Sequence, residues 1–415
     1  MRVERLGAGG AAADVLLGLH ERARRLRLPP PAALTGRWFG SAAVLAPSLD
    51  ARAVDSIPEV ATSPGPDGAV GGGWIGYRGY PDGAGVLPPA AGGWTSSVLR
   101  LDVDGCWWFE SLQDGGCPAD LASAVRTGGR ARPWEVQWRT PDEAQHHGAV
   151  EQCLAAITDG EVYQACVCTR FVGRLSGDPV QLFTDGVRST GPARAAFVAG
   201  SWGAVASLSP ELFLARHGRA VRSSPIKGTL PIGQDPALLR SSAKDVAENV
   251  MIVDLVRNDL GRVCVPGSIT VPELLAVQPA PAVWHLVSTV TGLLRVGTSD
   301  AELVEALFPP ASVTGTPKLR ARTLLAGWEA QPRGAYCGAV GMVSPWAGLE
   351  LNVAIRTVEV DPEGRVELGV GGGITSDSDP TAEWRECLAK ASAVTGLRSS
   401  AAAGPAYPRA ASTAS

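Results

Sequence analysis

The sequence predicts an α+β fold, because it combines two β-hairpin patterns, four helix-like segments and a strand-rich N-terminal part. Between Pro29 and Arg139, short apolar runs alternate with glycine and proline clusters, which is typical of strands and loops. The helix-like segments begin near Thr140, Asp245, Thr316 and Asp379. The chain of 415 residues is long enough to bury a large core, and it contains no internal repeat.

Thr140-Pro141-Asp142-Glu143 predicts the start of the first helix, because it is a capping box with proline at the first helical position. Val150, Leu154 and Ile157 keep helical spacing after it. The chain after Leu397 is rich in alanine, serine and proline, which is typical of a disordered tail. We therefore expect three portions: an N-terminal scaffold portion (1–139), a catalytic portion (140–398) and a disordered tail (399–415).

Glu211–Arg216 and Ala220–Ser224 are strand-like and flank His217-Gly218, which predicts a β-hairpin. Lys227 follows the second strand, within Ser224-Pro225-Ile226-Lys227-Gly228-Thr229. Pro225, two residues before the lysine, disfavours helix, and Gly228 after it permits a sharp turn. We therefore expect the Lys227 amine to project from a strand end. A solvated loop lysine is the ordinary alternative on local sequence alone.

Val353–Val360 and Val366–Val370 form the second hairpin pattern, with a turn at Asp361-Pro362-Glu363-Gly364. Arg356 lies in the first strand, where its guanidinium suits either a carboxylate ligand or a cross-strand ion pair. Gly371-Gly372-Gly373 follows the second strand, and we expect it to form a turn whose backbone N–H groups approach an anion. A plain tight turn is the alternative.

Two pairs of carboxylates are predicted on helices. Asp245 and Glu248 are three residues apart, so they share one helix face. Glu383 and Glu386 repeat this spacing on a helix that starts at Asp379-Pro380, a good N-cap followed by a good first residue. Like charges repel one another without a cation, and magnesium prefers oxygen ligands, so the two pairs predict a magnesium site. Two solvated helix faces are the alternative for either pair alone.

Two other segments carry polar side chains of interest. Gly315-Thr316-Pro317 predicts another helix start with its threonine as N-cap, so Thr314 and the free amides there form a second candidate anion site. His285 has apolar neighbours, and the local sequence favours a buried core histidine.

Charge and cysteine content exclude several classes of protein. The formal net charge is -4, which gives no basic field for nucleic acid, and no apolar run reaches the roughly 18 residues of a membrane helix. The N-terminus lacks a signal-peptide pattern, and the eight cysteines follow no metal-finger or disulfide spacing. We interpret Cys166 and Cys168, which share a face of one strand-like segment, as core thiols. We expect a cytoplasmic protein that binds neither nucleic acid nor membrane.

Seven motifs occur in a fixed order along the chain. They are Tyr163-Gln164, Ser209-Pro210-Glu211-Leu212-Phe213, Pro225-Ile226-Lys227-Gly228-Thr229, residues 248–262, Thr314-Gly315-Thr316-Pro317-Lys318, Ile355-Arg356-Thr357 and Gly371-Gly372-Gly373-Ile374. In this order they closely resemble the chorismate-utilising enzymes, and the resemblance is strong from Thr140 to Gly396. An ordered series is far more specific than any single motif. The resemblance implies two face-packed antiparallel sheets with helices outside.

Within that family, the residue at position 227 separates the branches. Anthranilate, isochorismate and salicylate synthases usually carry alanine there, whereas component I of aminodeoxychorismate synthase typically carries lysine. Lys227 therefore implies amination of chorismate at C4. Gln164 stands where the isochorismate type has its water-activating lysine, which argues against isochorismate or salicylate formation. Asp245, where several sister branches have glutamate, also resembles the aminodeoxychorismate branch.

The resemblance implies covalent catalysis by Lys227. As a neutral amine it attacks C2 of chorismate while the C4 hydroxyl leaves, and ammonia then attacks C4 and releases the lysine. Glu211 protonates the leaving hydroxyl, and His285 matches a further catalytic position. A nearby magnesium ion and desolvation favour the neutral amine.

The resemblance also implies the residues that bind metal and substrate. The implied Mg²⁺ ligands are Glu248 and Glu386 directly and Asp245 and Glu383 through water, and the ion anchors the ring carboxylate. The implied substrate-binding residues are Arg356, Tyr336 and the amides of Gly371, Gly372 and Gly373, which hold the enolpyruvyl carboxylate, together with Thr314 and Lys390.

The implied partner is a separate glutamine amidotransferase subunit that supplies ammonia, because the chain lacks the Gly-x-Cys-x-Gly turn of a glutaminase. The implied product, 4-amino-4-deoxychorismate, is converted to p-aminobenzoate by a separate lyase, for folate or for a specialised metabolite. The alternatives are amination at C2, as in anthranilate synthases, and a non-catalytic chorismate-binding partner of an amidotransferase. Cys166, Thr316 and Ile232 depart from the family pattern, but none of them removes a proposed catalytic group.

Overall fold

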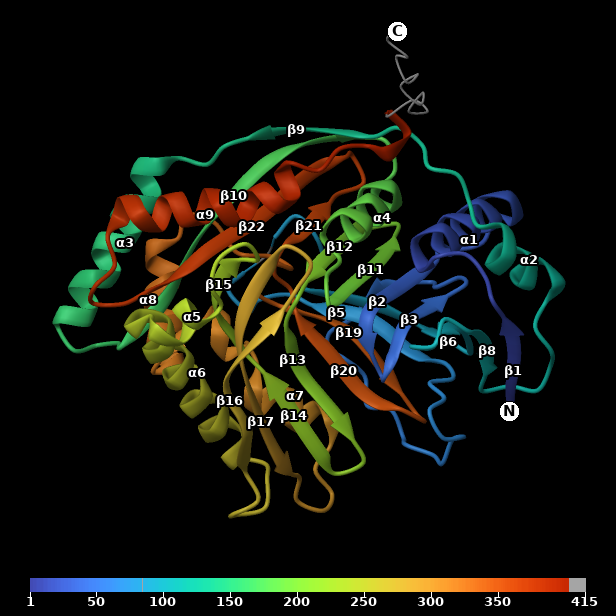
Figure 1. Cartoon of the computed structure of the whole chain (residues 1–415), viewed down its shortest axis with the longest axis horizontal. Helices are drawn as coiled ribbons and strands as arrows, with labels where there is room; N and C mark the ends of the chain where they lie inside the picture. Colours follow the sequence, from blue (N-terminus) through green and yellow to red (C-terminus); the bar gives the residue numbers. More distant parts are fainter. Residues whose placement is uncertain (84, 403–415) are drawn as a thin grey trace, which may run out of the picture.

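The structure is a computed structural model that describes residues 1–83 and 85–402. Two large antiparallel sheets pack face to face, and helices cover their outer faces (Figure 1). This architecture confirms the α+β fold that the sequence predicts.

The first sheet has 12 strands. In spatial order they are β1 (Arg2–Gly7), β8 (Trp107–Ser111), β7 (Ser97–Leu101), β3 (Ser41–Ala46), β2 (Ala32–Trp38), β11 (Arg194–Gly200), β12 (Gly203–Ser209), β21 (Thr357–Val360), β22 (Arg365–Ile374), β10 (Gln164–Ser176) and β18 (Gly315–Thr316), with β9 (Glu135–Arg139) also paired to β10.

The second sheet has 10 strands. In spatial order they are β15 (Ile226–Pro231), β17 (Val283–Leu293), β14 (Ala220–Ser224), β13 (Leu212–His217), β20 (Gly348–Val353), β19 (Ala339–Ser344), β5 (Gly73–Arg78), β6 (Ala90–Thr95) and β4 (Arg52–Ala53), with β16 (Thr270–Pro279) also paired to β17.

The helices lie outside the two sheets (Figure 1). They are α1 (Ala12–Leu26), α2 (Ala119–Thr127), α3 (Glu143–Thr158), α4 (Pro179–Thr190), α5 (Ala237–Ser241), α6 (Ala243–Gly261), α7 (Asp300–Leu307), α8 (Lys318–Trp328) and α9 (Pro380–Thr395), with short 3₁₀ helices η1 (Ala311–Val313) and η2 (Ser400–Ala402).

Strands from residues 1–139 belong to both sheets. β2 pairs with β11, so that Ala33 lies opposite Phe197, and β5 pairs with β19, so that Tyr77 lies opposite Val340. β9, at the end of the expected scaffold portion, pairs with β10 of the next portion. The expected boundary at residue 139 is therefore a point along shared sheets, and the N-terminal portion completes the sheets that carry the second portion.

The main core fills the space between the two sheets. Leu34 and Val44 of the first sheet and Ile75 and Met342 of the second sheet belong to one cluster of fully buried side chains. Each such side chain stabilises the fold by roughly 1.5–3 kcal/mol relative to exposure. Other clusters attach α1, α4 and α9 to the first sheet and α6 and α7 to the second. The helices are thus fixed on the sheets from outside.

The helix starts are set by their caps. Asp142, and not Thr140, caps α3, because its carboxylate accepts a hydrogen bond from the Gln145 N–H, so the predicted capping box is wrong. The Asp379 carboxylate caps α9 as predicted, by accepting from the Ala382 N–H. The capping residue therefore decides the first turn in both cases.

The predicted helix cap at Thr316 is wrong. Gly315 and Thr316 form strand β18 and pair with Gln164 and Ala165 of β10, and α8 begins only at Lys318. The prediction of an anion site depended on a helix N-terminus at Thr316, and the helix begins two residues later without a side-chain cap. The local argument for an anion site at this position therefore fails.

Both predicted hairpins are confirmed, as β13–β14 and β21–β22. The second turn is held by Asp361, whose carboxylate accepts from the backbone N–H groups of Glu363 and Arg365. The expected tail differs at its start, because η2 is anchored by a hydrogen bond from the Ser400 N–H to the Asp185 carboxylate. Residues 403–415 of the expected tail lie outside the described residues.

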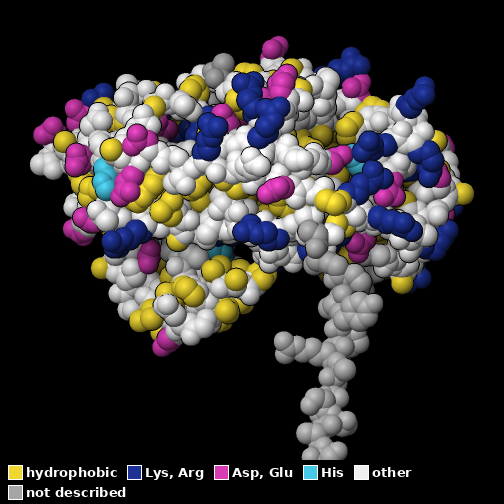
Figure 2. Space-filling model, turned by 90° about the horizontal axis from the view of Figure 1, so that it is seen from above, with side chains coloured by type: hydrophobic (Ala, Val, Ile, Leu, Met, Phe, Trp, Pro, Cys, Tyr) yellow, Lys and Arg dark blue, Asp and Glu magenta, His cyan; other side chains and the backbone are white. Residues whose placement is uncertain are grey.

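The outer surface carries mixed charge. Lysine, arginine, aspartate and glutamate side chains are interspersed on the face shown in Figure 2, in keeping with the small net charge. Within residues 1–83 and 85–402, no helix combines the length and the apolar character that a bilayer-spanning helix needs.

Candidate active site

Lys227 lies where the two sheets approach each other. It is the second residue of strand β15, not a loop residue, and its side chain is only 10% exposed. Its amine is 3.4 Å from the Glu248 carboxylate of α6. A Cβ added at Gly373 of β22 would lie 3.0 Å from the Lys227 Nζ and 2.8 Å from Glu248 Oε2. The lysine from one sheet therefore faces β22 of the other. We call β22 the glycine strand, because it contains Gly371, Gly372 and Gly373.

The predicted glycine turn is wrong, because Gly371, Gly372 and Gly373 all belong to strand β22. They pair with residues 166–168 of β10. β21 pairs with β22 only at 366–368, so the glycines extend beyond the end of that neighbour. Their lack of side chains lets neighbouring groups pack closely against the strand, because a Cβ at Gly371 would lie only 2.6 Å from the Cys168 sulfur. The triplet therefore forms a closely packed wall of the site and not a loop.

The charge of Lys227 is set by two opposing effects. Burial disfavours the ammonium, but the nearby Glu248, helped by Glu211, outweighs burial and raises the pKa of Lys227 above its ordinary value. The lysine is therefore an ammonium ion at neutral pH while Glu248 faces it. A nucleophilic amine at this position requires that contact to be lost.

Glu211 and Arg356 lie at two of the points where the chain crosses between the sheets. Glu211 joins β12 of the first sheet to β13 of the second, and Arg356 joins β20 of the second sheet to β21 of the first. The Val353 N–H donates to the Glu211 carbonyl at 3.1 Å, and the Leu208 N–H donates to the Arg356 carbonyl at 3.0 Å. These bonds hold the two crossings side by side.

The crossing gives Arg356 an unusual backbone. Its φ is +51°, in the left-handed region that non-glycine residues rarely adopt, so the prediction of an alternating strand at this residue is wrong. Among the described residues its guanidinium forms no ion pair, which also excludes the predicted cross-strand alternative there. Strain of this kind persists where the surrounding structure imposes it, often at functional sites.

Glu211 is a buried acid, with only 3% of the residue exposed. Burial raises its pKa to about 7, against the opposing effects of Lys227 and Arg356. A carboxyl group with this pKa is partly protonated at neutral pH. Glu211 can therefore donate a proton to a leaving group.

His285 lies on β17 and faces the same region. One ring nitrogen, Nδ1, is 3.0 Å from the Thr229 hydroxyl of β15, and within the described chain the other, Nε2, is buried without a hydrogen-bond partner. Burial, with the Arg356 charge, lowers the pKa of His285 to about 4. The imidazole is therefore neutral, and Nε2 is available to a ligand.

Tyr336 lines the glycine strand, whereas Thr314 supports a neighbouring strand. A Cβ at Gly369 would clash with the Tyr336 ring, and the Tyr336 hydroxyl is 3.9 Å from the Cys168 sulfur. The Thr314 hydroxyl donates to the Pro310 carbonyl at 2.7 Å, and its own carbonyl accepts from Cys166 of β10. Thr314 thus uses its polar groups to position β10.

Three glutamates of the predicted metal site each meet a lysine. Besides the Lys227–Glu248 pair, Lys244 donates to Glu383 at 2.7 Å and Lys390 to Glu386 at 2.7 Å. Lys390 also donates to the Gly371 carbonyl at 3.0 Å. The remaining carboxylate, Asp245, packs against Gly228 of the lysine strand. All four predicted carboxylates therefore lie around β15 and the glycine strand.

Magnesium fits this arrangement as an ion shared with a ligand. In residues 1–83 and 85–402, no three metal-ligating side chains are already gathered around one point. Magnesium usually takes one or two carboxylates and completes its shell with water and substrate oxygens, so a closed cluster is not required. A Cβ at Gly372 would lie 2.9 Å from Glu383 Oε2, a buried atom without a described partner, and Gly373 lies beside Glu248 Oε2. Two carboxylate oxygens thus flank adjacent glycines.

Two further groups support the site, although no motif in the sequence points to them. Lys244 is four residues before Glu248 on α6, a spacing that signals a helical ion pair, although in the structure it reaches Glu383. Arg333 and Glu329 have the same spacing and form a buried pair. Arg333 also donates to the carbonyl of Cys166, so this pair braces β10 behind the glycine strand.

The comparison with protein families identifies the chain. Residues 114–396, more than half of the chain, match the model of the family described as chorismate binding enzyme. The chain therefore belongs to this family. The match covers the predicted site residues, and it bears out the resemblance seen in the sequence motifs. Their individual roles stay predictions.

Two curated relatives narrow the comparison. The chain is 42% identical over 261 residues to aminodeoxychorismate synthase component 1 of Klebsiella aerogenes, covering 61% of this chain and 58% of that protein. It is 37% identical over 361 residues to aminodeoxychorismate synthase of Streptomyces pristinaespiralis, covering 77% of this chain and 50% of that protein. The chain thus matches between half and three fifths of the length of these relatives.

A solved structure supports the fold. Anthranilate synthase component I of Streptococcus pneumoniae TIGR4 aligns with a TM-score of 0.70 and 23% identity, over 88% of this chain and 90% of that chain. At this identity the likeness concerns the fold alone. It agrees with the two face-packed sheets described above.

Proposed function

We propose that the chain acts as component I of an aminodeoxychorismate synthase, which converts chorismate and ammonia to 4-amino-4-deoxychorismate and water. The observation that carries this proposal is a buried lysine, Lys227, that shares a site with the buried acid Glu211 and the unpaired guanidinium of Arg356. Three relatives that are 40–42% identical to the chain bear this name, which supports the assignment. The product serves p-aminobenzoate formation.

In the proposed reaction, Lys227 as a neutral amine attacks C2 of chorismate while the C4 hydroxyl leaves. Glu211 gives its proton to that hydroxyl, which departs as water. Ammonia then attacks C4, the ring π electrons shift back toward C2 and restore the diene, and the lysine leaves with the electron pair of its C2–N bond. The new C4 ammonium gives up one proton, which restores the acid form of Glu211. Loss of the Glu248 contact prepares the lysine, because burial alone favours its neutral form.

The substrate carries two carboxylates, and the site offers two places for them. Arg356 and Tyr336 hold the enolpyruvyl carboxylate against the glycine strand, where a flat backbone permits close approach. His285 offers its free Nε2 to the bound substrate. The unpaired, strained position of Arg356 supports the first of these roles.

The other carboxylate is proposed to share Mg²⁺ with the protein. Glu248 and Glu386 would hold the ion directly, and Asp245 and Glu383 through water. Bound there, the ion supplies positive charge for the ring carboxylate. The unpartnered Oε2 atom of Glu383 beside Gly372 supports this proposal.

Ammonia is proposed to come from a separate glutamine amidotransferase subunit. Free ammonium is a weaker substitute for that source, so the chain alone can be assayed with it. A cytoplasmic setting is proposed with this partner.

The test is the product formed by the purified chain from chorismate, magnesium and ammonium. The mixture is treated with aminodeoxychorismate lyase and separated against p-aminobenzoate and anthranilate standards. We expect p-aminobenzoate that depends on the lyase. Anthranilate as the product would replace the proposal with amination at C2, and no amine at all would replace it with a non-catalytic chorismate-binding protein.

A further inference from the structure

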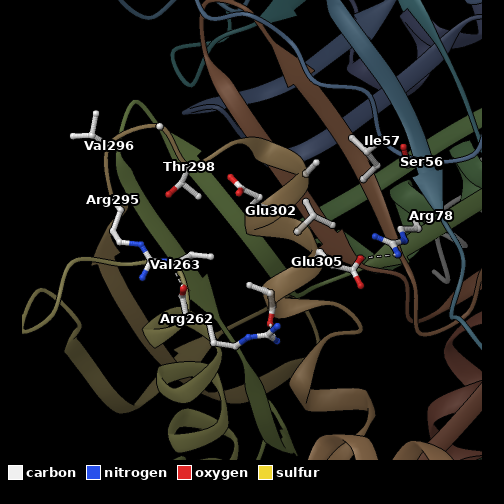
Figure 3. Close-up of a pocket in the computed structure, with 14 residues that line it drawn as sticks. Ser56, Ile57, Arg78, Arg262, Val263, Arg295, Val296, Thr298, Glu302 and Glu305 are labelled. Atoms are coloured by element: carbon white, nitrogen blue, oxygen red, sulfur yellow. Dashed lines mark hydrogen bonds and ion pairs between the residues drawn. The ribbon is translucent and has the colours of Figure 1, made fainter.

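A second hollow lies at the C-terminal end of α6. It has a volume of about 790 Å³ and is bordered by α7, by the segment after α6 and by the segment after β17 (Figure 3). We call it the arginine pocket, after Arg78, Arg262 and Arg295 in its wall. Its volume falls within the range of small-molecule sites. Arg262 follows Glu248 by 14 residues, which is about 21 Å along the axis of α6, so this pocket is separate from the Lys227 site.

Two of the three arginines lack an acidic partner. Arg78 pairs with Glu305 at 3.1 Å, but Arg262 and Arg295 form no ion pair within residues 1–83 and 85–402. The other carboxylate in the wall, Glu302, is already bound to the backbone N–H and hydroxyl of Ser299. The wall carries three arginines and two glutamates, so its formal charge is positive, and the guanidinium groups of Arg262 and Arg295 are held by no direct ion pair among the described residues.

Backbone carbonyls hold these two guanidinium groups in place. Arg262 donates to the Ala306 carbonyl at 3.3 Å in the last turn of α7, and Arg295 donates to the Arg262 carbonyl just after α6. Carbonyls at helix C-termini attract cations. A guanidinium has five N–H donors, so each group keeps most of its donors for a ligand. Both arginines are thus positioned by contacts that leave their charge unpaired.

The inner wall of the pocket is apolar. The wall is lined by Ile57, Val263 and Val304, which also pack into the hydrophobic core next to the pocket. Cationic donors beside an apolar wall suit an amphiphilic anion. We propose that the arginine pocket binds a small organic anion, with its carboxylate or phosphate group held by Arg262 and Arg295 and its apolar body against these three side chains.

The test is calorimetric titration of the full chain with benzoate, phenyl phosphate and the neutral benzyl alcohol. We expect saturable binding of at least one anion and none of the alcohol, and the two anions distinguish a carboxylate from a phosphate head group. The double substitution Arg262→Met and Arg295→Met is expected to weaken binding at least about tenfold. The control Arg257→Met removes an exposed arginine from the same helix, and binding is expected to stay unchanged.

A second variant keeps the test informative when the double variant does not fold. Ala301→Trp adds a bulky side chain at an exposed position in the pocket wall without removing charge, and it is expected to block binding. The variant Arg356→Met tests whether the anion binds in the candidate active site instead, because that site also suits carboxylates. Binding that is lost in Arg356→Met but kept in the double variant overturns the proposal, and so does the lack of saturable binding of either anion to the unmodified chain.

Discussion

The two ends of helix α6 each bring a carboxylate to a buried lysine, with opposite results. At the C-terminal end, the Lys318 amine donates to Asp259 at 2.6 Å and to the carbonyls of Leu307 at 2.6 Å and Pro309 at 2.9 Å, so all three of its donors are used. At the N-terminal end, Lys227 meets Glu248 at 3.4 Å. A lysine with all donors satisfied fixes structure, whereas a loosely held one remains able to react.

The charges around the two ends also differ. Acidic groups, Glu248 and Glu211, surround Lys227 and raise its pKa against burial. Burial lowers the pKa of Lys318, and the neighbouring Arg262 adds to this effect against Asp259. The helix dipole favours anions at the N-terminus and cations at the C-terminus. The same polarity underlies the carboxylate-rich site at one end and the arginine pocket at the other.

The largest expected effect is on the amination activity, and it comes from Lys227 near the N-terminal end of α6. Lys227→Ala removes the proposed nucleophile, so we expect lyase-dependent p-aminobenzoate formation to fall by at least about a thousandfold. The measurement is the coupled product assay with ammonium, with Arg257→Met as a control for loss of one positive charge. An amination rate that survives Lys227→Ala would show that the chemistry proceeds at C2 without this lysine.

At the C-terminal end, the expected effect is on stability. Lys318→Met leaves Asp259 buried and unpaired, so the free energy of unfolding should fall by about 3 kcal/mol. Lys227→Met should cost less, because Glu248 loses only one loose contact at 3.4 Å, whereas Asp259 loses a hydrogen bond of 2.6 Å. Urea denaturation of both variants measures the difference. Equal losses would mean that Lys227 is a structural residue too.

Glu211 provides a test that depends on pH. Its pKa of about 7 lies above the ordinary value, so the folded state binds its proton more tightly than the unfolded state does. This contribution to stability is present below the ordinary glutamate pKa and is lost as pH rises through about 7. Glu211→Gln should therefore raise the free energy of unfolding at pH 8, by on the order of 2 kcal/mol, and change it little at pH 4.

The same residue should control the pH profile of the reaction. As a proton donor, Glu211 predicts that kcat falls as pH rises through about 7, because the acid is then ionised. In Glu211→Gln this decline should vanish and kcat should be low throughout. A decline that persists in the variant would assign it to another group.

The smallest expected effect concerns Lys244, which neutralises Glu383. Its side chain is 36% exposed, so the pair contributes modestly to stability. Lys244→Met frees the glutamate, and we expect the protein without substrate to bind Mg²⁺ about two- to fivefold more tightly. Calorimetric titration with magnesium alone measures this, with Arg257→Met as a matched control. Unchanged or weaker affinity would mean that Glu383 does not face the ion.

Local sequence signals were sufficient for several elements near the site. The N-cap and proline at Asp379-Pro380 predicted the start of α9, and the spacing of Asp245 and Glu248 predicted that both lie on one helix. The hairpin before Lys227 was also predicted, although its first strand begins and ends one residue later than expected. Caps, turns and helical spacing act between near neighbours, so the sequence alone contains them.

Other features were mispredicted because they depend on distant strands. The glycine triplet has the composition of a turn, but pairing with β10 extends it into a strand. Arg356 has the pattern of a strand residue, but the chain must pass there from one sheet to the other. Local propensity yields to tertiary pairing when the pairing buries more of the chain.

By itself, the sequence determined the chemical inventory of this protein: a lysine, four carboxylates, an arginine and a glycine triplet in a family-specific order. It also determined the helices and hairpins that carry them. Only the tertiary structure decided that Lys227 meets Glu248, that Glu211 and Arg356 lie at adjacent sheet crossings, and that unpaired arginines gather at the far end of α6. These contacts join residues tens to hundreds of positions apart, and their geometry arises from the packing of two sheets, which no local pattern encodes.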